Sequence, residues 1–216
     1  MATASQANNL WRSGSPQAWR ILIAPKEKRL PNRSVCISFS SGVLKTPFFR
    51  ALIPRMWIPV LVEPVEPTRQ QAEEERTAEQ TIDATATSMS QGRTTVFGSD
   101  AILACLEKAY DEAPCMPRSP ALFAVSQPRL HESSKILSVV GDLVVYLLRF
   151  PHEKRDIAVV NAKWAPVECE LRLWESSLDG HQYLVDPNVP YLCDFPLFTN
   201  FAYAVRCGLQ LNGLYL

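Results

Sequence analysis

The stretch that most constrains the fold is residues 57–62, whose sequence is Trp-Ile-Pro-Val-Leu-Val. Its β-branched residues predict a strand, but proline cannot donate to a ladder and is excluded from central strands. Two interpretations follow. Either the strand begins after Pro59, or it is an edge strand entered through a cis Ile58–Pro59 bond, with the backbone of Ile58 free to pair with a ligand. Because cis bonds are only about 5% of X-Pro bonds, the stretch alone favours the first interpretation.

The composition limits the class of protein. The chain has 216 residues, of which 47% are hydrophobic, enough to bury a core in one large or two small domains. Lys and Arg together number 22, as do Asp and Glu, so there is no electrostatic footprint for nucleic acid or a membrane surface. The longest apolar stretch, residues 136–148, contains Asp142 and is too short to span a bilayer. We therefore expect a soluble globular protein that binds neither nucleic acid nor membrane.

The six cysteines show no Cys-x-x-Cys pair, and no pair of histidines lies near them. This spacing indicates neither a zinc site nor a dithiol redox site, so we expect no metal. Their pattern is typical of buried thiols in a reducing compartment, which favours a cytoplasmic protein.

The first half of the chain predicts a small sheet, with strands at residues 9–12, 34–39, 58–62 and 94–97. A helix follows the first strand, with Ser15 as its N-cap and Pro16 at its first position. Pro25 lies inside the apolar pattern of this helix, which must kink there or end early. Residues 42–52 are expected to be partly helical, and Ser99 is expected to cap a helix after the last strand. The order is βαβ followed by ββα.

Two segments of distinct composition divide this pattern. Residues 64–93 are rich in Glu, Gln, Thr, Ala and Ser, so we expect a disordered insertion between the third and fourth strands. Residues 114–120 are rich in proline and form the predicted linker between domains at residues 1–113 and 121–216. The second domain is predicted to be all-helical, with helices at residues 136–150, 157–178 and 194–206.

This order of elements, with a proline before the third strand and a helical second domain, resembles the glutathione transferases. Residues 13–20, Ser-Gly-Ser-Pro-Gln-Ala-Trp-Arg, resemble the active-site loop and first helix of the serine-type rho-like and zeta-like classes. Residues 53–61 resemble the family's Asn-Pro-Arg-Gly-x-Val-Pro-Val-Leu, residues 98–102 its Glu-Ser-x-Ala-Ile, and residues 191–194 its capping-box region. The resemblance implies a thioredoxin-like α/β domain, an all-α domain and a homodimer.

The resemblance also implies a role for two regions at the reacting sulfur. Ser15 matches the serine whose hydroxyl donates a hydrogen bond to the glutathione thiolate and lowers the thiol pKa, with Ser13 as the competing candidate. Considered without the resemblance, the sequence favours Ser15 as a plain N-cap. Ile58, followed by Pro59, matches the residue whose backbone pairs with the cysteinyl part of glutathione. The matches on both sides of residues 57–62 now favour the cis Ile58–Pro59 bond.

Further residues correspond to the two ends of the tripeptide. Ser99, at a helix N-terminus, matches the position that receives the γ-glutamyl carboxylate, and Lys45 the position that holds the glycyl carboxylate. Gly98 stands where the family has Glu or Gln facing the γ-glutamyl amine, a loss of about 1.5–3 kcal/mol of binding free energy. Asp194 matches the structural aspartate of the capping box.

We therefore predict a glutathione transferase that conjugates reduced glutathione, its co-substrate, to small hydrophobic electrophiles, an activity typical of detoxification. The alternatives are a non-catalytic transferase-like binding or assembly module, and a glutathione-dependent isomerase. Tyr191 replaces the Ser or Thr of the capping box, and the chain ends at Leu216 where the family continues into further helices. From these departures we expect an incomplete helical domain, with reduced stability and activity.

Overall fold

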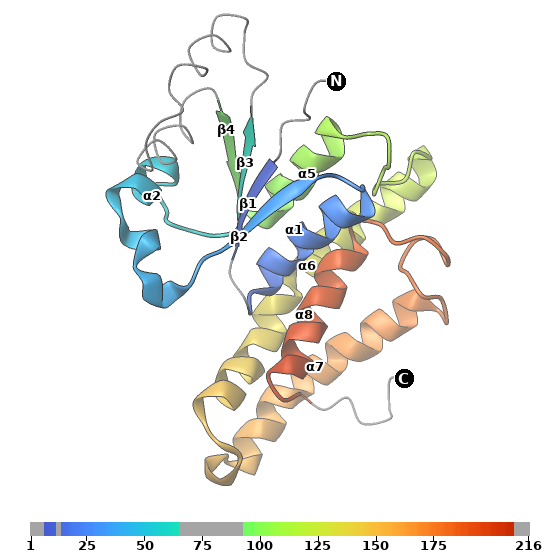
Figure 1. The fold of residues 1–216 in the computed structure, drawn as a ribbon. Helices are drawn as coiled ribbons and strands as arrows, with labels where there is room; N and C mark the ends of the chain where they lie inside the picture. The colour runs from blue at the N-terminus through green and yellow to red at the C-terminus, as the bar shows by residue number, and fades with distance from the viewer. Residues whose placement is uncertain (1–6, 12–13, 65–92, 210–216) are drawn as a thin grey trace, which may run out of the picture. The chain divides into compact units, whose positions relative to one another are not determined.

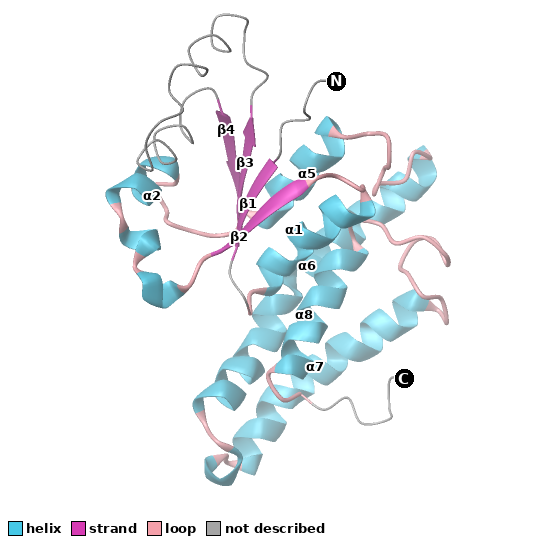
Figure 2. Cartoon of the chain, in the orientation of Figure 1, coloured by secondary structure: helices cyan, strands magenta, loops and turns pink. Residues whose placement is uncertain are grey.

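The computed structural model describes residues 7–11, 14–64 and 93–209 (Figure 1). The chain divides into two compact units, Met1–Asp111 and Glu112–Leu216. The first unit holds the strands together with several helices, and the second is helical (Figure 2). The predicted class, a thioredoxin-like βαβ-ββα domain followed by an all-α domain, is confirmed. Most of the predicted insertion at 64–93 lies outside the described residues.

The first unit is built on a four-stranded sheet with the strand order β2-β1-β3-β4. Its strands are β1 (Ala7–Trp11), β2 (Asn32–Cys36), β3 (Val60–Pro64) and β4 (Arg93–Phe97). β1 and β2 are parallel, because α1 (Pro16–Glu27) crosses over between them, whereas β1 pairs with β3 and β3 with β4 in antiparallel register. Pro25 lies inside α1, near its C-terminal end, and does not end the helix early.

Both interpretations of residues 57–62 are partly confirmed. The Ile58–Pro59 peptide bond is cis, as the resemblance implied. The strand nevertheless begins after the proline, at Val60, as the first interpretation expected. The prediction of an edge strand is wrong, since β3 lies between β1 and β4. Because Pro59 precedes the ladder, its missing N–H removes no hydrogen bond from the sheet.

The predicted strand at 34–39 is also placed differently, since β2 ends at Cys36. Ser38 accounts for the difference: its side chain accepts the Ser40 N–H at 3.3 Å and begins the 3-10 helix η1 (Phe39–Ser41). A second 3-10 helix, η2 (Val43–Lys45), and the short helix α2 (Pro47–Leu52) follow. The expectation of partial helix over residues 42–52 is therefore correct.

Both faces of β3 are buried. Val60 and Val62 pack with Ile37, Phe49 and Ile53 in one apolar cluster on the α2 side. Leu61, equally buried, points to the opposite face because side chains alternate along a strand. On that face α1 packs against α5 (Ser99–Ala109), and each helix turns its buried aliphatic side chains inward. A strand buried on both faces explains why residues 60–62 are continuously apolar.

The second unit consists of α6 (Pro120–Arg149), the 3-10 helix η3 (His152–Lys154), α7 (Ile157–Leu178) and α8 (Asp194–Arg206). The bounds of α7 and α8 agree with the predicted helices. The helix predicted at 136–150 is longer than expected, since α6 begins at Pro120. The buried core of the second unit is almost wholly aliphatic and aromatic. From α6 and α7 it includes Ile136, Val140, Leu143, Val144, Leu147, Val167, Leu171 and Trp174.

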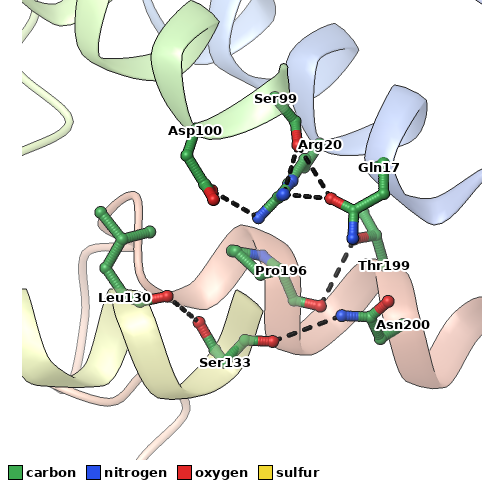
Figure 3. A network of polar contacts seen from close by, with 9 residues as sticks. All are labelled: Gln17, Arg20, Ser99, Asp100, Leu130, Ser133, Pro196, Thr199 and Asn200. Carbon is green, nitrogen blue, oxygen red and sulfur yellow. Dashed lines mark hydrogen bonds and ion pairs between the residues drawn. The ribbon is translucent and has the colours of Figure 1, made fainter. Parts of the chain in front are cut away.

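Hydrogen bonds supplement this core where polar groups are buried. Ser133 donates its hydroxyl to the Leu130 carbonyl one turn back at 3.1 Å, and Asn200 of α8 donates to the Ser133 carbonyl at 3.3 Å (Figure 3). The second bond ties α8 to α6. Among the residues that the structure describes, no helix is long and apolar enough to cross a membrane.

Candidate functional site

Ser15 lies at the start of α1, as predicted. It is the N-cap, with an extended backbone, and its hydroxyl oxygen accepts the Ala18 N–H at 3.4 Å. Pro16 occupies the first helical position, where its missing N–H removes no helical hydrogen bond. The competing candidate, Ser13, lies outside the described residues.

The start of α5 lies beside the proline that precedes β3. Gly98 donates its N–H to the Pro59 carbonyl at 3.4 Å, which extends the β3–β4 ladder by one step. The prediction that Ser99 caps this helix is wrong: Gly98 is the N-cap and Ser99 is the first helical residue. Gly98 takes φ 84°, a conformation that favours glycine, and offers no side chain to the first turn. The side-chain caps seen at α1 and α7 are therefore missing at α5.

Ile58 and Lys45 stand at two other candidate positions. The hydrogen bonds of the described residues include none to the backbone of Ile58, so its N–H and C=O are open to an added strand. Lys45 is the last residue of η2, and its side chain is exposed. A shallow hollow of about 220 Å³ between α2 and β4 is lined by Phe48, Ala51, Leu52 and Thr95. None of the candidate residues lines it.

A buried cation joins the starts of α1 and α5. Arg20 is only 3% exposed, and its Nη2 donates to the Gln17 side-chain oxygen and to the Ser99 hydroxyl (Figure 3). Its Nη1 pairs with an Asp100 carboxylate oxygen at 2.9 Å. Ser99 in turn donates its proton to the Gln17 Oε1 at 2.8 Å. Burial lowers the pKa of Arg20, and the Asp100 charge opposes that shift.

A second buried cation lies near the other end of the same helix pair. Lys28, 5% exposed, pairs with a Glu107 carboxylate oxygen at 2.6 Å and donates to the Tyr110 carbonyl at 2.8 Å. Of these two partners of Lys28, Glu107 lies in the last turn of α5 and Tyr110 directly follows the helix. The pair of helices is thus held by one cation near the N-terminus of α5 and another near its C-terminus.

Asp194 is buried in the second unit and satisfies two backbone donors. Its carboxylate oxygens accept the N–H groups of Leu184 and Tyr191, each at 2.8 Å. Tyr191 lacks the Ser or Thr side chain of a capping box, but half of the box is present, because the Asp194 carboxylate accepts the backbone N–H of Tyr191. Cys193 donates its S–H to the same carboxylate at 3.7 Å. Burial, with the Asp194 charge second, raises the pKa of the Cys193 thiol, so the sulfur stays protonated.

The residue types along the chain did not single out Gln17 and Arg20 as functional candidates. Arg20 and Ser99 lie 79 positions apart in the sequence, so no local pattern links them. The available signal was an arginine among the inward-facing residues of an amphipathic helix, since a buried charge requires a partner. Asp100, the second residue of α5, is the carboxylate partner of Arg20. Among the described residues, no group of three or more His, Cys, Asp or Glu could hold a metal ion.

Comparison with known proteins agrees with this architecture, although no protein-family model matches the chain. The sequence is 25% identical over 205 residues to glutathione S-transferase A of Pleuronectes platessa, covering 93% of this chain and 78% of that protein. The structure matches a glutathione S-transferase from the Antarctic clam Laternula elliptica with a TM-score of 0.73 and 24% identity, over 98% of this chain and 83% of that one. The chain has a glutathione transferase-like fold.

A bacterial structure extends the comparison. A glutathione transferase from Burkholderia graminis, solved with two glutathione molecules bound per subunit, matches with a TM-score of 0.70 and 18% identity. The match covers 95% of this chain and 75% of that protein. The chain is thus similar in sequence to one glutathione transferase and in fold to several.

Proposed function

We propose that the chain binds reduced glutathione and transfers its sulfur to small hydrophobic electrophiles, with the Ser15 hydroxyl stabilising the thiolate. The observation that carries this proposal is the geometry of Ser15. Its oxygen accepts the Ala18 N–H at the helix start, and no hydrogen bond donated by its O–H is found among the described residues. A hydroxyl that accepts from a helix and keeps its proton for an anion fits a thiolate donor.

The energies are of the right size for this role. Lowering a thiol pKa by two units requires about 2.7 kcal/mol of preferential interaction with the thiolate. A hydrogen bond to a charged group contributes about 1.5–3 kcal/mol, and the N-terminus of a helix adds about 0.3–1 kcal/mol for an anion. Ser15 and the N-terminus of α1 together can therefore supply most of the shift.

The remaining parts of glutathione are assigned to candidate positions around the start of α5. The Ile58 backbone would pair with the cysteinyl unit as an added strand, beside Pro59 and Gly98. The first turn of α5, beginning at Ser99, would receive the γ-glutamyl carboxylate, and Lys45 the glycyl carboxylate. Glutathione bound to the related Burkholderia graminis enzyme supports the same ligand here.

The proposed reaction is a substitution. With an aryl halide as acceptor, the glutathione thiol first releases its proton to water. The thiolate sulfur then attacks the ring carbon, the C–S bond forms, and the halide leaves with the electron pair of the broken bond. No redox change is involved. The protein contributes a prepared thiolate held next to an apolar acceptor.

We also propose that the protein is a cytoplasmic homodimer with a role in detoxification, as the resemblance implies. Chromatography with light-scattering detection tests the oligomeric state. A mass of one chain, 24.2 kDa, at micromolar concentration would contradict the dimer.

The function is tested by retention on immobilised glutathione and by conjugation of glutathione to a generic aryl halide. Ser15→Ala is expected to keep glutathione binding but to lower kcat at least tenfold, because it removes the thiolate donor. Ser38→Ala is the matched control, since Ser38 is also an N-cap serine of the first unit but caps η1. Equal activity of Ser15→Ala and Ser38→Ala would contradict the role of Ser15.

A second candidate function is a non-catalytic binding or assembly module. Gly98 favours it, because the position that would face the γ-glutamyl amine has no side chain and a backbone φ of 84° that disfavours one. A wild-type chain that is not retained on glutathione would establish this candidate over the transferase. Isomerase chemistry is tested with the same protein, glutathione and a substrate that contains a cis double bond.

A further inference from the structure

The cluster centred on Arg20 joins the two helix starts to which the proposed function assigns the thiolate and the γ-glutamyl carboxylate (Figure 3). We propose that Arg20 is a positioning residue for recognition of that carboxylate. It holds the first two residues of α5, Ser99 and Asp100, so that the backbone N–H groups of the first turn face the anion. This inference rests on the proposed function and adds to it a residue for which the resemblance gave no role.

The contacts of Arg20 determine where the first turn of α5 lies. Its guanidinium bridges two consecutive residues, one nitrogen on the Ser99 hydroxyl and the other on the Asp100 carboxylate. A planar fork fixes both distance and direction, which a single ammonium group cannot do. Gln17, in the first turn of α1, accepts from the same guanidinium. Arg20 thus fixes the position of the start of α5 relative to the first turn of α1.

The hydroxyl of Ser99 is already used within this cluster. A serine has one proton to donate, and Ser99 donates it to the Gln17 Oε1 at 2.8 Å. Its oxygen meanwhile accepts from Arg20. A carboxylate at the start of α5 would therefore be bound by backbone N–H groups, and Gly98 leaves them without a side-chain cap. The orientation of that turn then decides the affinity.

The charge of Arg20 also favours binding of a carboxylate at the start of α5. The guanidinium is almost fully buried, whereas the side chain of its partner Asp100 is 57% exposed. Water screens the exposed carboxylate more strongly than the buried cation. This difference in screening favours a positive net potential at the start of α5, and with it an anionic ligand.

Lys28 supplies an internal control, because it is a second buried cation in the same helix pair. It pairs with Glu107 and the Tyr110 carbonyl near the other end of α5. We expect its removal to disturb the packing of α1 on α5 without moving the first turn of α5, which Lys28 does not contact in these bonds. The double variant Lys28→Met/Glu107→Leu removes this pair without leaving one charge buried alone.

The experiment compares two ligands by isothermal titration: glutathione, and its analogue γ-aminobutyryl-cysteinylglycine, in which hydrogen replaces the γ-glutamyl α-carboxylate. Arg20→Met is expected to weaken glutathione binding at least tenfold and binding of the analogue less than twofold. Lys28→Met/Glu107→Leu is expected to change neither by more than twofold. If Arg20→Met does not fold, Arg20→Lys serves in its place, with an expected loss of at least threefold for glutathione alone.

Three results would overturn the inference. An equal loss for both ligands would mean that Arg20 acts through the general integrity of the unit, and no loss for either would mean that it has no part in binding. A wild-type chain that binds neither ligand would remove the proposed function and this inference together. That failure is recognised in the wild type itself, whereas failure of the inference alone is seen only in the variants.

Discussion

The two units of the protein bury different kinds of side chain between their helices. In the first unit α1 and α5 enclose two cations, Arg20 and Lys28, each paired with a carboxylate. In the second unit α6, α7 and α8 enclose an aliphatic and aromatic core, whose principal buried charge is Asp194. Apolar burial stabilises without fixing direction, while a buried ion pair adds little net stability but requires one geometry. This difference indicates that the relative position of two helices is specified most strictly for α1 and α5.

The largest effect is expected where the helical unit departs from its apolar pattern. Asp194→Ala removes the acceptor of one buried and one partly buried backbone N–H group, and hydrogen bonds to a charged group contribute about 1.5–3 kcal/mol each. We expect a loss of about 3–4 kcal/mol in the free energy of unfolding, measured with urea. Asp186→Ala is the matched control, since Asp186 accepts the N–H groups of Asn188 and Val189 in an exposed loop. A similar loss for both variants would contradict the importance of burial.

Leu143→Ala tests the apolar core of the same unit. Leu143 is 1% exposed, and deletion of a buried leucine side chain usually costs about 2–5 kcal/mol. We expect about 3 kcal/mol from urea unfolding. Leu148→Ala, on the same helix but 61% exposed, should change stability by less than about 0.5 kcal/mol. If the two variants are equally stable, α6 does not pack as described.

Lys28→Met tests the buried ion pair between Lys28 and Glu107 in the first unit. The substitution leaves Glu107 and the Tyr110 carbonyl without their cation, and we expect a loss of about 2 kcal/mol, below the usual value for a fully buried pair because Glu107 is partly exposed. Lys28→Met/Glu107→Leu should recover most of this loss in urea unfolding. A double variant that is less stable than Lys28→Met would show that the ion pair itself is a main source of stability.

The pH dependence of stability separates the charge of Asp194 from its hydrogen bonds. Burial raises the pKa of Asp194 above its ordinary value of 3.8, although the bonds from Leu184 and Tyr191 lower it. The folded state then binds the proton more readily than the unfolded state, so stability falls as pH rises from 3.8 through the folded pKa. The stability of the wild type relative to Asp194→Asn should therefore decrease as the pH rises above 3.8. An increase over this range would show a lowered pKa instead.

The smallest perturbation is chemical labelling of the thiols. Cys36 and Cys169 are exposed and should react with a maleimide within minutes, whereas Cys115 and Cys193 are buried and should react only after unfolding. Mass spectrometry of peptides from native and urea-treated protein reads out each site. Rapid native labelling of Cys193 would contradict both its burial and its raised pKa.

Local signals made α7 and α8 predictable to the residue. Asp156 accepts the Ala158 N–H at 2.8 Å and marks the start of α7, and Gly208 follows the end of α8. The first half of α6 was missed because Ser126 and Ser133 occupy buried positions, so the apolar repeat is interrupted. Here tertiary packing and hydrogen bonds to the preceding turn replace hydrophobicity as the reason for burial.

The candidate site was predictable only in part, for a similar reason. Ser15 and the cis Ile58–Pro59 bond belong to short segments whose order along the chain resembles a known family. The bridge from Arg20 to Ser99 and Asp100 depends on how α1 lies on α5, which no pattern within either helix specifies. The same applies to Gly98, whose role as N-cap depends on the conformation at the end of β4.

The register of β3 with β4 places Pro64 and Arg93, the residues that flank the long connection, at the opposite end of the hairpin from Pro59 and Gly98. The ladder runs from Val60 opposite Phe97 to Pro64 opposite Arg93, about 14 Å along the strands. Closing a connection of 28 residues instead of four costs only about 2 kcal/mol of chain entropy, because the cost grows with the logarithm of length. Changes in this connection can therefore accumulate at modest thermodynamic cost, while the end of the hairpin that carries Pro59 and Gly98 is constrained by pairing.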